Sequence, residues 1–191
     1  SRYGLLAFGS SLDQIGPLAR SVADCADALN VVSSHDLRDS TSVKAPFTDF
    51  GQDLETGITG LKIGVPKEYL VDGIEPGVRS AFEASLKTLE DLGAEISETS
   101  LPLTDHALAV YYIIAPSEAS ANLSRYDGVK YGLGSTDSQN SAEATQAARG
   151  EGFGDEVKRR IFLGTYALSA GYYDAYYKKA QQVRTLIRRE F

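Results

Sequence analysis

The stretch Leu61–Ser100, which reads LKIGVPKEYLVDGIEPGVRSAFEASLKTLEDLGAEISETS, decides the fold class. It opens with the apolar run Leu61–Val65, closed by a proline, as is typical of a buried strand. A helical pattern begins at Pro76, because proline fits the first turn of a helix, and a weaker strand pattern covers Ala94–Ser100. The stretch therefore predicts a strand, a helix and a strand in that order.

A strand–helix–strand unit of this kind indicates two parallel strands joined by a crossover helix, and hence an α/β fold. Gly93 is placed to cap the end of the helix. The helix also carries apolar residues at helical spacing, namely Val78, Phe82, Leu86 and Leu89. Only two strand patterns are clear, so we expect a small sheet or one that chain outside this sequence completes.

Composition is that of an ordinary globular protein. The 191 residues suit one domain, with 42% hydrophobic and 24% charged residues. A net charge of −7 argues against general binding to nucleic acids or anionic membranes. The single cysteine, Cys25, excludes an internal disulfide and favours an intracellular protein. No apolar run approaches the roughly 18–20 residues that a membrane span needs. The chain contains no Met, so we expect a piece of a longer protein.

The N-terminal region predicts one helix. Ser21 is a plausible N-cap, and Cys25 lies on the apolar stripe that follows it, which favours a buried structural thiol. The serines in Gly9–Ser11 do not form a nucleophile elbow, so a loop-forming or helix-capping role is expected for them. Residues 34–60 are polar and acidic and predict a long surface connection. One helical turn around residues 53–56 is compatible with this pattern.

A second helix is expected to be capped by Thr104 or Asp105 and to be broken or kinked by Pro116. It carries the pair Tyr111 and Tyr112, whose hydroxyls are candidates for ligand contacts. The alternative is that both tyrosines simply lie on a half-buried helix.

Two signals follow this helix. Residues 132–141 are expected to form a mobile loop, because their composition is rich in Gly, Ser and Asn. Asn140 and Glu143 form a capping box for a short helix that is expected to end at Gly150. No metal-ligand spacing and no phosphate-binding glycine loop occur in the sequence.

The segment Gly150–Arg184 contains two helical patterns separated at Gly171, which predicts a helix hairpin with facing apolar stripes. The first begins near Asp155 and places Val157, Ile161, Phe162 and Leu168 on roughly one face. The second begins at about Tyr172. The first pattern also carries a basic triplet, not all of which can face solvent if the helix is covered on more than one side. At least one of Lys158, Arg159 and Arg160 is therefore a candidate for binding an anion.

Four segments of the chain carry a more specific signal. They read SRYGLLAFGSSLDQIGPLARSV, PKEYL, SEASANLSRYDGVKYG and EGFGDEVKRRIFLGTYALSAGYYDAYYKKAQQVR. They closely resemble the A subunits of aspartyl/glutamyl-tRNA amidotransferases, which are amidase-signature enzymes, and the likeness covers essentially all 191 residues. It implies an amidase-signature fold, with a central mixed sheet flanked by helices. The chain would be the middle portion of that domain, a single partial domain over residues 1–191.

The resemblance also implies an activity. The family's A subunit hydrolyses glutamine, and the ammonia converts a misacylated Glu-tRNA(Gln) or Asp-tRNA(Asn) in an ATP-dependent ligase reaction of protein biosynthesis. A B subunit performs the activation with ATP and Mg, and a small C subunit clamps the two. We expect no cofactor or metal on this chain, no membrane contact, and a cytoplasmic location in a bacterium or an organellar one in a eukaryote.

Two other functions are considered. One is that of another amidase-superfamily hydrolase. The segment YYDAYYKKAQQVR argues against it, because this segment resembles the tRNA-dependent enzymes. The other is a stand-alone RNA-binding helical module that uses the basic helices from Asp155 onward. The negative net charge of the chain argues against it, because RNA is itself negatively charged.

Site residues are likewise implied by the resemblance. The family's serine–cis-serine–lysine triad is expected upstream of Ser1, so no catalytic residue is assigned in this chain and the chain alone is predicted to be inactive.

The substrate-binding residues map to Tyr111, with Tyr112 as the alternative, and to Arg160, with Arg159 as the alternative. A guanidinium suits the α-carboxylate of free glutamine, because it binds carboxylates through two parallel hydrogen bonds. The alternative role for this arginine is an ion pair with a carboxylate of the chain itself. Lys158 is expected to face solvent.

Overall fold

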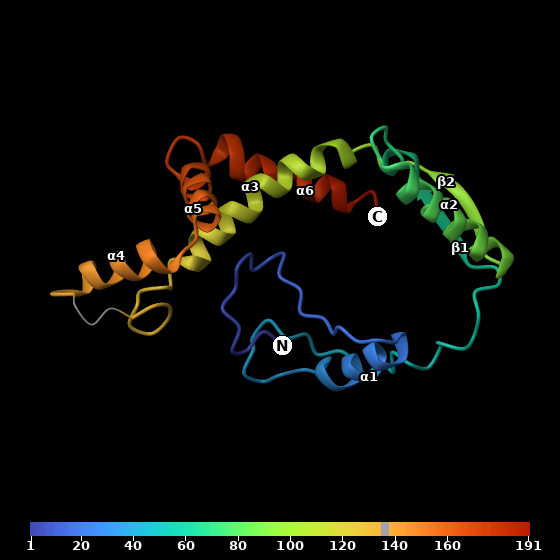
Figure 1. Ribbon diagram of the computed structural model, residues 1–191, viewed down its shortest axis with the longest axis horizontal. Helices are drawn as coiled ribbons and strands as arrows, with labels where there is room; N and C mark the ends of the chain where they lie inside the picture. The colour runs from blue at the N-terminus through green and yellow to red at the C-terminus, as the bar shows by residue number, and fades with distance from the viewer. Residues whose placement is uncertain (135–137) are drawn as a thin grey trace. The chain divides into compact units, whose positions relative to one another are not determined.

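The computed structural model describes residues 1–134 and 138–191, whose helices and strands are labelled in Figure 1. The chain forms two compact units. The first unit consists of Ser1–Leu5 and Gln14–Thr104, and the second of Leu6–Asp13 and Asp105–Phe191. The short segment Leu6–Asp13 thus belongs to the second unit although its neighbours in sequence belong to the first. The single partial domain expected over residues 1–191 stays a prediction.

The first unit contains the predicted βαβ unit. Strand β1 (Lys62–Pro66) pairs in parallel with β2 (Glu95–Thr99), and α2 (Pro76–Asp91) connects them after a short 3-10 turn, η1 (Lys67–Tyr69). The α/β class is therefore confirmed.

The local signals around α2 are also confirmed. Pro76 is its first residue, and Gly93 adopts a φ of 94° just after its end. That backbone conformation favours glycine, and a Cβ there would also come within 2.9 Å of the Thr59 hydroxyl oxygen. The expectation of a buried strand is wrong, since none of the five residues of β1 is buried. A two-stranded sheet with one helix along it has too few layers to cover its strands.

Helix α1 (Val22–Val32) begins as expected, because the hydroxyl of Ser21 accepts a hydrogen bond from the Asp24 amide at 3.1 Å. Cys25 is only partly buried, so the expected buried thiol is not found; Ala26 is the buried residue of the helix. Among the described residues, 34–60 form no helix or strand. In place of the helical turn allowed for near residue 53 there are successive hydrogen-bonded turns, the last from the Thr56 amide to the Asp53 carbonyl at 3.2 Å.

Two aspartates tie the start of the chain to this connection. Asp36 accepts a hydrogen bond from the Ser1 hydroxyl at 2.9 Å, and Asp39 accepts one from the Arg2 amide at 2.6 Å. Hydrogen bonds from the Arg38 amide, and then from its side chain and from Ser1, lower the pKa of Asp36 to about 2. The Thr41 hydroxyl, followed by the Arg2 amide, lowers the pKa of Asp39 to about 2.

The second unit is helical in its described residues. Its elements are α3 (Thr104–Leu123), α4 (Ser141–Gly152), α5 (Asp155–Leu168), the π-helix η2 (Asp174–Lys178) and α6 (Lys179–Arg188). Its core joins α6 to α3, which lie beside one another in Figure 1. Val110 and Ile114 of α3 pack with Ala180, and these are surrounded by Ile113, Val183 and Ile187. The apolar face of α6 therefore packs on α3, whereas the sequence predicted packing on α5.

The expected break at Pro116 is not found, because α3 runs unbroken through this residue, and the alternative of a kink stays a prediction. A proline inside a helix leaves one carbonyl without its usual donor and crowds the preceding turn. The carbonyl that loses its donor here is that of Tyr112, four residues before the proline. Both Pro116 and Ser117 are buried in the packing around α3. Tertiary packing on α3 thus outweighs the local preference of the proline.

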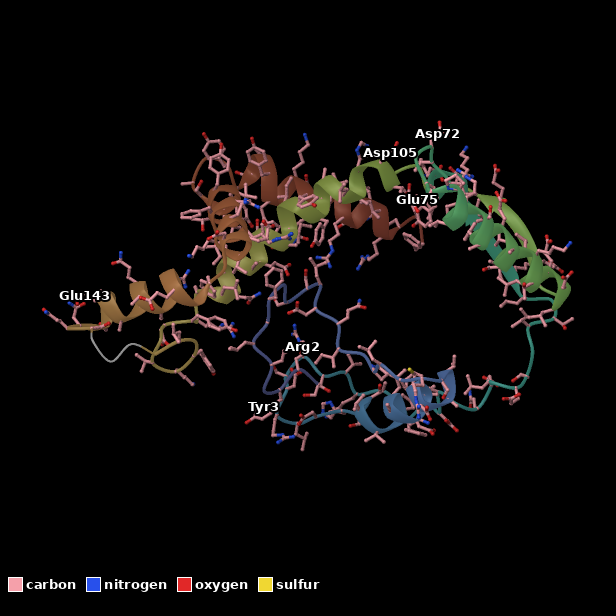
Figure 2. The ribbon with its side chains drawn as sticks, in the orientation of Figure 1. Arg2, Tyr3, Asp72, Glu75, Asp105 and Glu143 are labelled. Atoms are coloured by element: carbon pink, nitrogen blue, oxygen red, sulfur yellow. The ribbon has the colours of Figure 1, made fainter. Side chains whose placement is uncertain are left out.

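Helix α4 is capped as predicted, because the Asn140 side chain accepts a hydrogen bond from the Glu143 amide at 3.0 Å. Figure 2 shows Glu143 at the start of this helix, whose last residue is Gly152 instead of the expected Gly150. Part of the loop expected at 132–141 lies outside the described residues, since 135–137 are not among them.

The break at Gly171 is confirmed, because this residue has a φ of 90° in the turn after α5. The facing apolar stripes of the expected hairpin are not found, since the apolar face of α6 packs on α3. Phe162 was expected on the apolar stripe of α5, but it is 75% exposed, and Gly164 and Ala167 are the buried residues of the helix. The tyrosine-rich segment begins as a π-helix, which the helical spacing did not predict. None of the helices described is long and apolar enough to cross a membrane.

Candidate functional site

The candidate site is built where α5 crosses α3. Gly164 lies directly on the backbone of α3, and a Cβ added to it would come within 1.9 Å of the Pro116 carbonyl oxygen. Beside this point the hydroxyls of Ser120 and Thr165 lie 2.7 Å apart, within hydrogen-bond distance. The absence of a side chain at position 164 therefore lets the two helices approach closely.

This crossing brings the two predicted substrate-binding residues together. Arg160, one turn before Gly164 on α5, donates a hydrogen bond from Nη1 to the hydroxyl of Tyr111 at 3.5 Å. Its Nε donates to the Glu156 carboxylate at 2.9 Å. The ion pair within the chain, which was the alternative role for this arginine, is thus present alongside the contact with Tyr111.

The structure also separates each candidate from its alternative. The Arg160 side chain is 25% exposed and lies at the edge of the buried face of α5, whereas that of Arg159 is 67% exposed and binds only Glu156 among the described residues. Tyr112 packs edge to face on Tyr111, with ring centroids 5.3 Å apart, and has no bond to Arg160. Lys158 is half-buried, so it is more enclosed than expected.

The pair has the chemistry of an anion site. The Tyr111 hydroxyl, and then Glu156, raise the pKa of Arg160, so the guanidinium is firmly cationic. Its Nη2 has no acceptor among the described residues. A carboxylate placed at the Nη1–Nη2 edge would meet two parallel donors, with the tyrosine hydroxyl beside them. No cluster of His, Cys, Asp and Glu suited to a metal occurs in the described part of the chain.

A second group of residues, further along α3, was not predicted from the sequence. Ser11 is held by Glu118 of α3 and Arg184 of α6, which lie 107 and 173 residues further along the chain. The Ser11 amide donates to Glu118 at 2.9 Å, and its hydroxyl donates to the same carboxylate. Arg184 donates to the Ser11 hydroxyl at 2.6 Å and to its carbonyl at 2.9 Å. No local pattern indicates such distant contacts.

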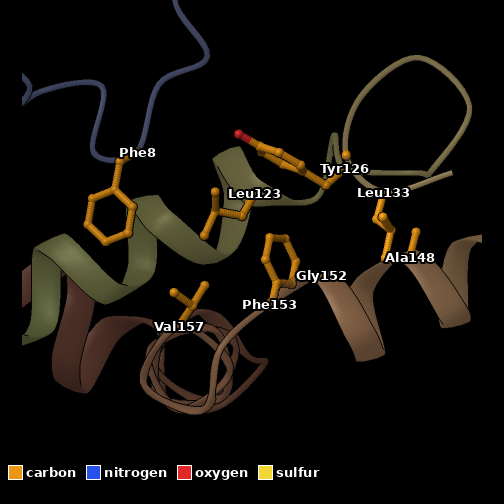
Figure 3. A pocket seen from close by; sticks show the side chains of 9 residues that line it. Phe8, Leu123, Tyr126, Leu133, Ala148, Gly152, Phe153 and Val157 are labelled. Atoms are coloured by element: carbon orange, nitrogen blue, oxygen red, sulfur yellow. The ribbon is translucent and has the colours of Figure 1, made fainter.

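An apolar cavity of about 610 Å³ lies at the other end of the crossing (Figure 3). Phe8 of the N-terminal segment and Leu123 of α3 both line it. Tyr126 and Phe153 meet edge to face with ring centroids 5.4 Å apart. Val157 lines it from α5, one turn before Arg160. The segment that carries Ser11 therefore also supplies one wall of this cavity.

Comparisons with known proteins identify the family to which the chain belongs. The family model described as Amidase matches residues 1–191. The chain belongs to the amidase family. It is 58% identical over 191 residues to the A subunit of the glutamyl-tRNA(Gln) amidotransferase of Syntrophus aciditrophicus strain SB, and 59% identical to that of Carboxydothermus hydrogenoformans. In both cases 100% of this chain is covered but 39% of the relative, so the chain spans well under half the length of these proteins.

Solved structures show the same family fold. The crystal structure of the glutamyl-tRNA(Gln) amidotransferase A subunit from Thermotoga maritima matches with a TM-score of 0.71 at 42% identity, over 100% of this chain and 36% of that one. A bacterial aryl acylamidase of the amidase-signature family matches with a TM-score of 0.63 at 22% identity, over 89% of this chain and 32% of that one, which shows the fold alone. The amidase-signature fold implied by the sequence is confirmed.

Proposed function

We propose that this chain is part of the glutamine-hydrolysing A subunit of a tRNA-dependent amidotransferase. The observation that carries the proposal is the contact of Arg160 with Tyr111, made in a chain that is 58% identical to a relative of that name. Arg160 on α5 and Tyr111 on α3 thus lie together, with donors placed so that they could bind a carboxylate. Free glutamine has an α-carboxylate, which a peptide-linked amide lacks, so such a site selects the free amino acid.

The remaining parts of the proposal extend the family resemblance of the sequence. Ammonia released from glutamine converts Glu-tRNA(Gln), or Asp-tRNA(Asn), to the correctly paired product. The B and C subunits are the partners, and ATP and Mg serve the B subunit instead of this chain. The enzyme works in the cytoplasm, and the nucleophile of the amidase reaction belongs to the part of the protein outside these 191 residues.

The test uses the full-length protein in complex with its B and C partners. Amidation of Glu-tRNA(Gln) is measured with glutamine and, separately, with ammonium as the nitrogen donor. We expect both donors to work with ATP, and only the glutamine reaction to be blocked by a glutamine analogue that alkylates the nucleophile. A complex that amidates with neither donor, or that hydrolyses simple aryl amides in preference to glutamine, would contradict the proposal.

A further inference from the structure

The residues that hold Ser11 form a compact group, which we call the serine clamp and which consists of Ser11, Glu118 and Arg184. Each charged side chain makes two bonds to the serine, one to its main chain and one to its hydroxyl. Within the described residues Glu118 and Arg184 form no ion pair with each other. Ser11 is therefore the bridge between a carboxylate on α3 and a guanidinium on α6.

The clamp is one part of a wider attachment of the segment Phe8–Asp13. The Asp13 carboxylate accepts the amides of Phe8 and Gly9 at 2.9 Å each, so the segment is closed on itself. Asn122 of α3 donates to the Phe8 carbonyl at 3.1 Å. A short closed loop is thus fixed to α3 at two points, through Glu118 and Asn122.

The face of α3 that receives this loop is the face that carries Tyr111. Glu118 and Asn122 follow Tyr111 by seven and eleven residues, which places all three within about 20° of one direction around a helix of 3.6 residues per turn. Charged groups also hold a loop more firmly than neutral ones, because each charge-assisted hydrogen bond is worth roughly twice a neutral one. The loop and the proposed substrate-binding tyrosine therefore share one surface.

We propose that Glu118 and Arg184 are positioning residues of the glutamine site, because they hold Ser11 from two helices and so fix the segment Phe8–Asp13 on the face of α3 that carries Tyr111. The inference rests on the proposed function for its substrate. It assigns neither residue to the reacting atoms, since both act through Ser11. Their loss should weaken glutamine binding more than it slows the chemical step.

The experiment uses the full-length protein in its complex and compares Glu118→Ala, Arg184→Ala, the double variant and Ser11→Ala. We expect KM for glutamine to rise about tenfold in each charged-residue variant, with kcat and the ammonium-driven rate within about twofold of wild type. KM for glutamine in the double variant should be little higher than in either single variant, because both residues act on the same serine. Ser11→Ala should have a smaller effect, since the main-chain bonds remain. Arg188→Ala is the control, one turn further along α6 and exposed.

Equal losses with glutamine and ammonium, or additive losses in the double variant, would overturn the inference. Hydrogen exchange of the Ser11 amide gives a second readout that is independent of activity. We expect the Ser11 amide to exchange faster in both Glu118→Ala and Arg184→Ala. An unchanged exchange rate in Arg184→Ala would overturn the inference that Arg184 helps to hold Ser11. A wild-type complex inactive with glutamine would defeat the proposed function, and the exchange measurement would still decide whether the two residues hold the segment.

Discussion

At the scale of single residues, the environment of an arginine distinguishes it better than its place in the sequence. Arg159 and Arg160 are adjacent, and both bind the same carboxylate of Glu156. Only Arg160 also reaches a second helix, with its stem partly buried and its guanidinium at the Tyr111 hydroxyl. A surface ion pair such as that of Arg159 contributes little, because solvent screens it.

The first prediction compares these two arginines in the full-length complex. Arg160→Ala should raise KM for glutamine by about 10- to 100-fold, since a hydrogen bond to a charged group is worth about 1.5–3 kcal/mol. Arg159→Ala, the matched control, should change KM by less than about twofold. Steady-state kinetics with glutamine and with ammonium measures both. If the ammonium reaction falls as far as the glutamine reaction in Arg160→Ala, the arginine is structural.

At the scale of elements, the crossing of α3 and α5 depends on one missing side chain. A Cβ at position 164 would overlap the main chain of Pro116 and approach the Ser120 Cβ to 2.8 Å, and a main chain cannot move aside as a flexible side chain can. Gly150 in α4 is the opposite case, because nothing lies within 4 Å of a Cβ built there.

The second prediction follows from this contrast. Gly164→Ala should lower the free energy of unfolding by about 1–3 kcal/mol or more, as overpacking does. Gly150→Ala should raise it by about 0.5–1 kcal/mol, because alanine favours a helix over glycine at an unstrained position. Urea unfolding of both variants and wild type tests the pair. A neutral Gly164→Ala would mean that the helices can separate without cost.

The third prediction concerns the element formed by the chain start and the connection around Asp39. The pKa of Asp39 is about 2 here against an ordinary 3.8, so its carboxylate stabilises this element above about pH 3.8 and loses the effect as the pH falls through about 2. NMR titration should show the Arg2 amide resonance shifting in that window. Asp39→Asn is the control and should remove the transition. A shift centred near pH 4 would show that the carboxylate is not held.

The sequence predicted elements well wherever the signal was local. The caps at Ser21 and Asn140 and the turn at Gly93 each depend on residues within a few positions, and all are present. Phe162 was misplaced because helical spacing shows which residues share a face but not what covers that face. Pro116 stayed within α3 because close packing from α5 offset a local preference.

The candidate site was only half visible from the sequence. Tyr111 and Arg160 were named through a resemblance to a family, and the structure brings them together, although their role remains a proposal. The serine clamp was not predicted, since its partners lie 107 and 173 residues from Ser11 and neither belongs to a motif with a known spacing. Contacts over such distances follow from tertiary structure alone.

At the scale of the whole molecule, burial is distributed unevenly. The centre of α3 is the best-buried region described, with Ile114, Ala115 and Ala119 at 0–1% exposure, whereas no residue of β1 is buried. Slow hydrogen exchange follows buried contacts and low exposure of the backbone.

The fourth prediction is therefore an order of protection from hydrogen exchange. Amides around Ala119 should exchange more slowly than those of β1 by at least about tenfold. Exchange measured by NMR or mass spectrometry on the 191-residue chain checks this order, with the α1 amide of Ala26 as an internal reference in the first unit. Equal protection of α3 and β1 would show that burial in α3 does not set its local stability.

The place of Leu6–Asp13 in the second unit has a consequence for the order in which the chain is made. This segment leaves the ribosome well before Arg184, which holds Ser11 and follows it by 173 residues. At roughly 5–20 residues per second, the segment waits about 9–35 s for that partner. Asp39 follows Arg2 by only 37 residues and is available within seconds. The first unit can therefore assemble during synthesis, while the loop held by Glu118 and Arg184 closes only once α6 has been translated.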